Sequence, residues 1–170
     1  MDQRGEASHR LEKLCNVVDM IAHCEGRSES LLRVSCWIEL GDYKLEESAS
    51  PGSHISLQLQ VAVLSAFRRA ISVPNCGYKA WHNWALLNFR ITQQMNESEE
   101  GSTVRQRNLS SSDALRNHVI EAVKGFTSAI SLGTKRWSAS VQQDLLNLLT
   151  CLFKYGDLQD VSLTIELGIG

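Results

Sequence analysis

The chain has 170 residues, of which 43% are hydrophobic and 21% charged, and its formal net charge at pH 7 is -2. This length suffices for one globular domain with a buried core, and the near-neutral charge excludes a global field that would favour nucleic acid or an anionic membrane. No apolar run approaches the roughly 20 residues of a membrane span, and the polar N-terminus has no apolar signal region. We therefore expect a cytoplasmic or nuclear protein.

Hydrophobic periodicity predicts a series of helices separated by turns that contain glycine or proline. The second helix is expected to end at Gly41, because glycine readily adopts the left-handed conformation that closes a helix. Asp113 is expected to cap the fifth helix. The predicted helices have the approximate bounds 7–24, 29–40, 54–72, 78–95, 113–132 and 138–155, with a seventh beginning at 161–167.

Residues 96–112 differ from the rest of the chain, since they contain almost no apolar side chains. Such a segment cannot offset the entropy lost on ordering, so it is predicted to be a disordered surface insertion. Within it, Arg105-x-Arg107-x-x-Ser110 matches the pattern that basophilic protein kinases favour, which makes Ser110 a candidate phosphorylation site. The alternative is an unmodified solvated loop, because short motifs of this kind often arise by chance.

The helix over residues 78–90 is rich in aromatic side chains. Four of its residues share one face at the spacing i, i+3, i+4 and i+7: Trp81, Trp84, Ala85 and Asn88. Two indoles beside an alanine make a flat surface that a second helix can approach closely. Packing between helices is favoured over a platform for stacking a ligand, because aromatic side chains are mostly buried.

Two sequence patterns that recur within the chain indicate a repeated architecture. The pattern Phe-x-x-Ala-Ile-Ser occurs at residues 67–72 and again at 126–131, and a Gly-Asp turn occurs at 41–42 and at 156–157. Helix pairs joined by short turns are typical of repeat proteins. The sequence therefore predicts an all-α fold, an α-solenoid of tetratricopeptide (TPR)- and HEAT-like helical hairpins with one disordered insertion, rather than a closed bundle.

The five cysteines are odd in number and widely spaced, and no two form a Cys-x-x-Cys pair. Because the spacing fits neither a zinc site nor a redox motif, we expect reduced thiols that act as small hydrophobic side chains. These residues are Cys15, Cys24, Cys36, Cys76 and Cys151.

No catalytic motif is found in the sequence. It contains no Gly-rich phosphate loop, His-Glu-x-x-His, Gly-x-Ser-x-Gly elbow, kinase catalytic loop or Asp-Phe-Gly triplet. The five histidines are scattered, and His82, beside two tryptophans, is expected to be a hydrogen-bonded packing residue rather than a catalytic base. We therefore expect no enzymatic activity, no metal and no cofactor in this chain.

One block of the sequence reads Tyr-Lys-Ala-Trp-His-Asn-Trp-Ala at 78–85, followed by Asn-Phe at 88–89. This block resembles the signature helix in the FAT domain of TOR, a phosphatidylinositol-3-kinase-related protein kinase. Further blocks resemble that family in the same order, at 31–43, 122–132 and 143–161. The resemblance covers about residues 30–168, so residues 1–170 are interpreted as one FAT-domain segment. The insertion at 96–112 falls where TOR proteins carry one of variable length.

The resemblance implies a role and a set of partners. In that family the FAT domain is an α-solenoid that wraps the kinase domain, scaffolds the TOR complexes and restrains kinase activity. The chain is thus expected to be a non-catalytic regulatory segment in TOR growth and nutrient signalling. Its partners would be the kinase domain of the same longer polypeptide and TOR complex subunits, in the cytoplasm, in the nucleus or at endomembrane surfaces.

Two other interpretations remain open. A free-standing helical-repeat adaptor would bind a peptide or partner helix in its concave groove. The residues Tyr-Lys-Ala-Trp-His at 78–82 argue against the second, a FAT segment from the nonsense-mediated-decay or DNA-damage branch of the same kinases. The apolar end of the chain, with Ile165, Leu167 and Ile169, indicates that a polar end-cap is missing and predicts poor solubility of the isolated chain. Its abrupt end within an expected helix pair indicates a fragment, a truncated gene model or an excised piece of a much longer kinase.

The resemblance also implies a ligand. The family's FAT domain binds inositol hexakisphosphate through a cluster of Lys and Arg, and Lys79 falls on one of those positions. Ser35 and Glu39 occupy two others where a basic residue is expected. Because a polyanion is held by charge pairing and charge-assisted hydrogen bonds, Lys79 is expected to be a remnant of a weakened site.

Overall fold

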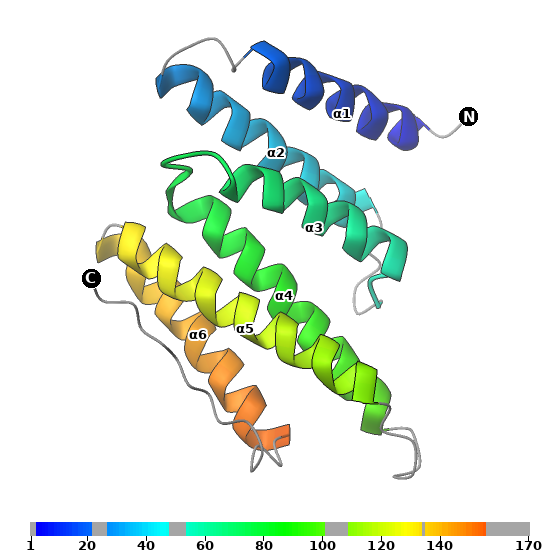
Figure 1. Cartoon of the computed structure of the whole chain (residues 1–170), viewed down its shortest axis with the longest axis vertical. Coiled ribbons are helices and arrows are strands. Elements are labelled where there is room, and N and C mark those ends of the chain that lie inside the picture. Colours follow the sequence, from blue (N-terminus) through cyan, green and yellow to red (C-terminus); the bar gives the residue numbers. More distant parts are fainter. Residues whose placement is uncertain (1–2, 22–26, 48–53, 101–108, 134, 156–170) are drawn as a thin grey trace.

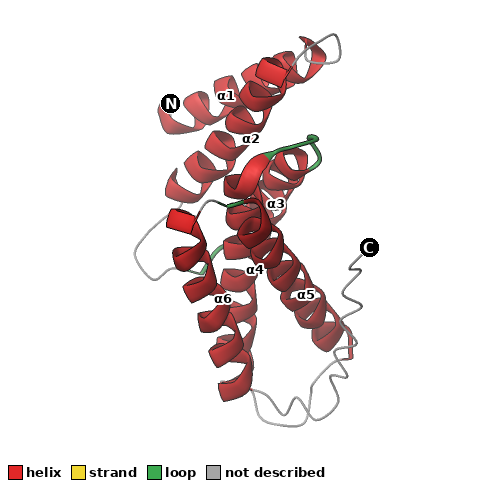
Figure 2. Ribbon diagram, turned by 90° about the vertical axis from the view of Figure 1, so that its left-hand side faces the viewer, coloured by secondary structure: helices red, strands yellow, loops and turns green. Residues whose placement is uncertain are grey.

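The computed structural model describes residues 3–21, 27–47, 54–100, 109–133 and 135–155, and within these ranges every regular element is a helix (Figure 2). The expected all-α helical-repeat class is therefore confirmed. The helices are α1 (Gln3–Ile21), α2 (Arg27–Glu47), α3 (Leu57–Ile71), α4 (Gly77–Glu100), α5 (Leu109–Leu132) and α6 (Lys135–Tyr155).

The helices are stacked along the long axis of the molecule, from α1 at one end to α5 and α6 at the other (Figure 1). Each helix packs against the next one in the chain, and α4 also contacts both α2 and α6. The even-numbered helices thus form one continuous layer, against which α1, α3 and α5 pack. This two-layer stack of antiparallel neighbours is the arrangement expected of helical hairpins.

The repeated pattern corresponds to equivalent core positions in α3 and α5. Phe67 and Phe126 are 1% and 0% exposed, and Ala70 and Ala129 are both fully buried. A phenylalanine and a small residue one turn later on the same face let each helix pack closely on the layer below. The recurring Phe-x-x-Ala-Ile-Ser pattern therefore corresponds to a structural repeat.

The expectation that the second helix ends at Gly41 is wrong, because α2 continues to Glu47. Gly41 is buried inside the helix, and a Cβ built on it would lie 2.2 Å from Cε1 of Phe67. The absence of a side chain, rather than a left-handed conformation, is what this position requires. The turn role falls instead to Asn75 and Gly77, which adopt φ values of 58° and 78° between α3 and α4.

Two other predicted boundaries also change. Ser56 caps α3, and its hydroxyl accepts a hydrogen bond from the Leu59 amide at 3.3 Å. Asp113 is not a cap, since α5 already begins at Leu109.

The helices α4 and α5 extend into both ends of the predicted insertion, because residues 96–100 and 109–112 are helical. Residues 101–108, which form the middle of that insertion, lie outside the described residues. So do the predicted seventh helix at 161–167 and the Gly-Asp echo at 156–157.

Candidate functional site

The aromatic face of α4 packs against both α3 and α5, since Trp84 clusters with Phe67 of α3 and Ala85 with Phe126 of α5. Trp84, Ala85 and Asn88 are 2%, 0% and 1% exposed, while Trp81 is half-buried. On the other side of the contact, a Cβ on Gly125 would lie 2.8 Å from the Ala85 Cβ, so the two helix backbones approach closely there. The prediction of interhelix packing is confirmed.

A chain of hydrogen bonds runs through this α4–α5 contact. Trp84 Nε1 donates to Glu121 Oε2 at 3.1 Å, and Asn88 Nδ2 donates to the Trp84 carbonyl at 2.8 Å. His118 Nδ1 lies 2.8 Å from Asn88 Oδ1, and it must donate because an amide oxygen can only accept. Burial lowers the pKa of His118, which keeps the ring neutral at pH 7. These bonds fix the register of α5 on α4.

His82 links α4 to α6. Its Nε2 lies 2.8 Å from Asp144 Oδ2, and its ring is tilted against Phe126 with centroids 6.1 Å apart. This is the hydrogen-bonded packing histidine that the sequence predicted. Its partner Asp144 was not identified as such from the sequence, since nothing local signals a contact between residues so far apart in the chain.

A second polar centre, also missed from the sequence, joins α1, α2 and α3. Asp19 on α1 accepts hydrogen bonds from Arg33 Nε, from Trp37 Nε1 at 3.0 Å and from Arg69 at 3.4 Å. The Arg69 guanidinium also stacks over the Trp37 ring, 4.6 Å from its centroid. Burial alone would raise the pKa of Asp19, but the bonds from Trp37 and Arg33 and the charges of Arg33 and Arg69 outweigh it and lower the pKa.

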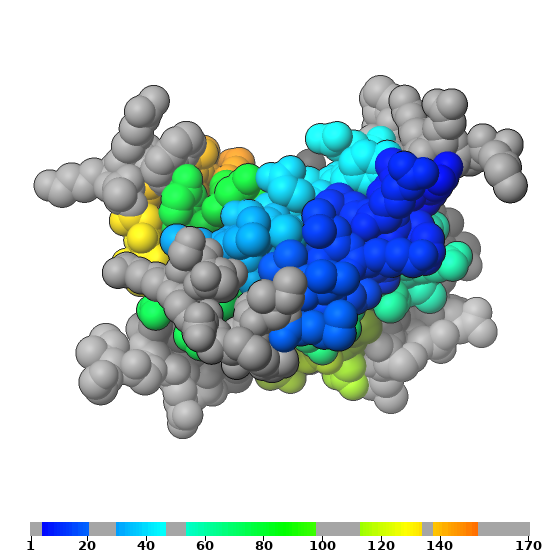
Figure 3. Space-filling model, turned by 90° about the horizontal axis from the view of Figure 1, so that it is seen from above, coloured from blue at the N-terminus to red at the C-terminus, as the bar shows by residue number. Residues whose placement is uncertain are grey.

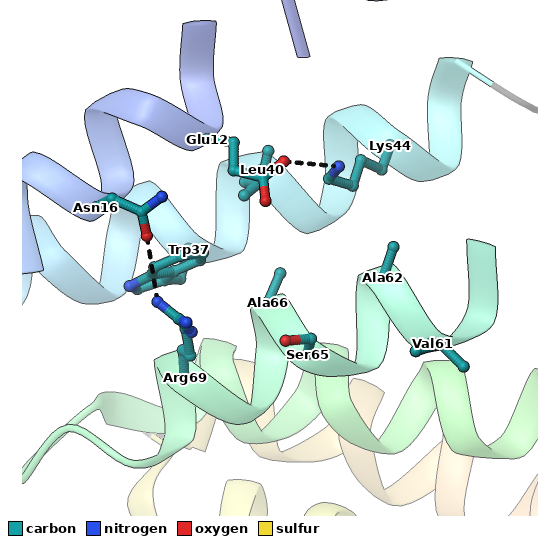
Figure 4. Close-up of a pocket in the computed structure, with 10 residues that line it drawn as sticks. All are labelled: Glu12, Asn16, Trp37, Leu40, Lys44, Val61, Ala62, Ser65, Ala66 and Arg69. Carbon is teal, nitrogen blue, oxygen red and sulfur yellow. Dashed lines mark hydrogen bonds and ion pairs between the residues drawn. The ribbon is translucent and has the colours of Figure 1, made fainter. Parts of the chain in front are cut away.

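A groove of about 330 Å³ opens beside this centre, between α1 and α3, with α2 as its floor (Figure 4). Its lining residues are Glu12, Asn16, Trp37, Leu40, Lys44, Val61, Ala62, Ser65, Ala66 and Arg69. Its charges are already paired, since Lys44 Nζ lies 3.3 Å from Glu12 Oε2 and Arg69 Nη1 lies 3.4 Å from Asp19 Oδ2. The groove offers apolar contact, with Val61 60% exposed, rather than catalytic groups.

Lys79 lies on the exposed side of α4, facing α2. Its ammonium is 3.7 Å from Glu39 Oε1, and the two side chains are 57% and 65% exposed. One turn further along α4, Asn83 Nδ2 donates to both carboxylate oxygens of Asp42, at 3.0 and 3.2 Å. Lys79, the cation that the resemblance assigns to an inositol hexakisphosphate site, thus has a carboxylate beside it, and its role in binding that ligand stays a prediction.

The remaining candidate residues can be placed only in part. Ser110 falls in the first turn of α5, but its side chain is not described, so phosphorylation there stays a prediction. Four cysteines are free, and Cys24 lies outside the described residues. Burial raises the pKa of the Cys15 thiol to about 12, and this thiol donates to the Cys36 carbonyl at 3.3 Å.

The residues that the structure describes lack two kinds of feature. They contain no group of three or more His, Cys, Asp and Glu side chains placed to hold a metal ion. Within the same residues, no helix combines the length and the apolar character that crossing a membrane requires.

The fold and its contacts define an all-α helical-repeat segment whose helices are joined by polar bridges. A family model described as the FAT domain matches residues 22–150, which is most of the chain. The chain therefore belongs to the FAT domain family, and the resemblance on which the sequence analysis relied is confirmed.

The similar proteins are TOR kinases. The chain is 30% identical over 155 residues to the serine/threonine-protein kinase tor1 of Schizosaccharomyces pombe, an alignment that covers 89% of this chain. It is 28% identical to TOR2 of Saccharomyces cerevisiae over 86% of its length, and 29% identical to mTor of Drosophila melanogaster over 79%. In each case the match spans 6% of the kinase.

Proposed function

We propose that this chain is a non-catalytic regulatory segment of a TOR-like serine/threonine kinase, part of the FAT clamp that wraps and restrains the kinase domain in growth and nutrient signalling. The observation that carries the proposal is the match itself, which covers 89% of this chain but only 6% of the S. pombe kinase. A short helical segment of a very long kinase is suited to scaffolding, and the kinase motifs are absent from this sequence. The compartment would be that of the whole kinase, the cytoplasm or the nucleus.

The outer face of α1 supports attachment to further helices of the same polypeptide. Leu14, Val17 and Met20 follow one another at i, i+3 and i+6, and they are 52%, 43% and 67% exposed. Seen from above, α1 forms the surface at this end of the stack (Figure 3). Because large apolar side chains at helical spacing are typical of a packed face, we assign this stripe to contact with a neighbouring helix of the longer chain.

The groove between α1 and α3 favours one alternative, a free-standing adaptor that binds a peptide or a helix. Its apolar wall at Val61 and its volume of about 330 Å³ could hold one or two side chains of such a partner. The adaptor needs no kinase domain, whereas the regulatory segment does.

The transcript that encodes the chain separates the two functions. We expect the reading frame to continue beyond the codon for Gly170 into a kinase catalytic loop and an Asp-Phe-Gly motif. A stop codon at that point would overturn the regulatory proposal and favour the adaptor.

The restraining role is tested in the longer kinase. His82→Ala would remove the bond between α4 and α6 and is expected to raise basal kinase activity, with exposed Gln93→Ala as the matched control on the same helix. Unchanged basal activity in a His82→Ala kinase whose melting temperature has fallen would contradict restraint.

A further inference from the structure

One exposed surface between α2 and α4 has a charge opposite to the one that the family resemblance implies. It consists of Ser35, Glu39 and Asp42 on α2 together with Lys79 and Asn83 on α4, and we call it the α2–α4 face. Ser35, Glu39 and Asp42 follow one another at i, i+4 and i+7, so they share one side of α2. Arg90 of α4 lines a hollow with Asp42 and Asn83 at the edge of this face, and Glu46 of α2 is a further neighbour of Asp42. With these two included, three carboxylates stand against two cations, so the excess charge is negative.

The ammonium of Lys79 already has a carboxylate beside it. It lies 3.7 Å from Glu39 Oε1, and both side chains are more than half exposed, so the pair is screened by water and gives little stability. The Lys79–Glu39 pair is important because it disfavours the binding of an anion at Lys79. A phosphate approaching Lys79 would have to displace Glu39 or lie beside its negative charge, and like charges at such distances oppose each other.

Asp42 adds to this effect from a more buried position. Burial raises the pKa of its carboxyl group, Lys79 lowers it, and the neighbouring charges of Glu39 and Glu46 raise it further. The two bonds from Asn83 fix the Asp42 carboxylate toward α4, so it cannot turn away from an incoming anion.

We infer that the α2–α4 face does not take inositol hexakisphosphate or any comparable polyanion, because Glu39 and Asp42 supply negative charge to this face from within the chain, beside Lys79. In this FAT segment the contact between the two helices is complete without a phosphate ligand. The inference concerns the charge of one surface and needs no kinase measurement, so it and the proposed function can fail independently.

The test is a calorimetric titration of inositol hexakisphosphate into the 170-residue chain, at about 0.05 M salt, where surface charges are weakly screened. We expect no saturable binding to the wild type. In the double variant Ser35→Arg, Glu39→Lys we expect saturable binding, at least about tenfold tighter than the limit of detection that the wild-type titration sets, because two new cations join Lys79. Adding Lys79→Gln to that variant should remove most of the gain.

Two further variants serve as controls for this titration. The pair Ser140→Arg, Glu97→Lys makes the same charge change at exposed positions on α6 and α4 and should not gain binding. If Glu39→Lys prevents folding, as judged by circular dichroism, Glu39→Gln with Ser35→Arg takes its place. It should bind inositol hexakisphosphate more tightly than the wild type does.

Each outcome decides the matter. Wild-type binding that Lys79→Gln weakens would overturn the inference, and so would a folded double variant that binds no better than the matched control. Wild-type binding that Lys79→Gln leaves unchanged would locate the polyanion elsewhere on the chain and would support the inference for this face.

Discussion

The two ends of the helix stack are held together in different ways. At the α4–α5 contact, α4 buries apolar and polar side chains alike, including Trp84, Asn88 and Thr92. At the other end, only Ser8 and Cys15 are buried among the described side chains of α1, and its polar link to α2 and α3 runs through Asp19. Most of the large apolar residues of α4, such as Trp84, Leu87 and Ile91, are buried, whereas Leu14, Val17 and Met20 of α1 are exposed.

The α4–α5 contact is thus complete within this chain, whereas the outer face of α1 is left uncovered. Every buried side-chain nitrogen and oxygen of the described residues has a hydrogen-bond partner, so the α4–α5 contact needs nothing further. The α1 end combines one charged centre with an uncovered apolar stripe. Changes at α4–α5 should therefore act on the stability of this chain, and changes on the outside of α1 should act on its association.

The largest effect is expected from Gly125→Leu. A Cβ at this position would lie 2.8 Å from the Ala85 Cβ and 3.0 Å from the Trp81 carbonyl oxygen, so a leucine would force α4 and α5 apart. We expect the free energy of unfolding to fall by about 3 kcal/mol, as measured by urea denaturation. Exposed Asn117→Leu on the same helix is the control, and a similar loss in both variants would refute the close contact.

A smaller loss is expected from Asp19→Asn. The variant keeps a hydrogen-bond acceptor for Trp37 but removes the charge that pairs with Arg33 and Arg69, which should cost about 1–2 kcal/mol. Because the folded pKa of Asp19 is depressed, its contribution is present above the unfolded pKa, near 3.9, and is lost as the pH falls through the folded pKa. Urea melts at pH 7 and pH 3 should therefore differ less for the variant than for the wild type.

Mild acid should weaken the α4–α5 contact by on the order of 1 kcal/mol or less, through His118. Its folded pKa is lowered, so below about pH 6.5 the unfolded chain binds a proton that the folded chain does not, and stability falls as the pH drops. His118→Gln should flatten this part of the pH profile, as followed by thermal unfolding between pH 7.5 and 5.5. A profile that is identical with and without the histidine would contradict the assignment.

The smallest effect on stability is expected from the double change Val17→Ser, Met20→Ser on the outer face of α1. Since both side chains are exposed, the free energy of unfolding of the isolated chain should change by less than about 0.5 kcal/mol. Sedimentation should instead show less self-association than in the wild type. Leu57→Ser on α3, where the leucine is 76% exposed, is the comparison, and equal behaviour would show that the α1 stripe has no special role.

The elements that local pattern determines were predicted from the sequence. The six described helices, the packed face around Trp84 and the equivalence of Phe67 and Phe126 all follow from periodicity and repetition. Gly41 was misread because a glycine that ends a helix and one that admits a neighbouring ring look alike in sequence. Only the position of Phe67, which comes from tertiary packing, distinguishes them.

The polar bridges were beyond sequence reasoning for a related reason. Asp19, Glu121 and Asp144 are ordinary surface-type residues in sequence, and each acquires its role from a partner on another helix. Only His82 carried a signal, because a histidine between two tryptophans on a buried face requires a partner. The reduced positive charge around Lys79 was predicted from Ser35 and Glu39, whereas the Asp42–Asn83 bonds were not.

The short stretch of α4 from Lys79 to Asn83 has a mechanical consequence. Lys79 and Asn83 reach α2, while His82 reaches α6, so one segment of one helix links both neighbours in its layer. A rotation of α4 about its own axis would strain all of these links in a single movement. A rotational displacement imposed on α2 would therefore be transmitted through α4 to α6.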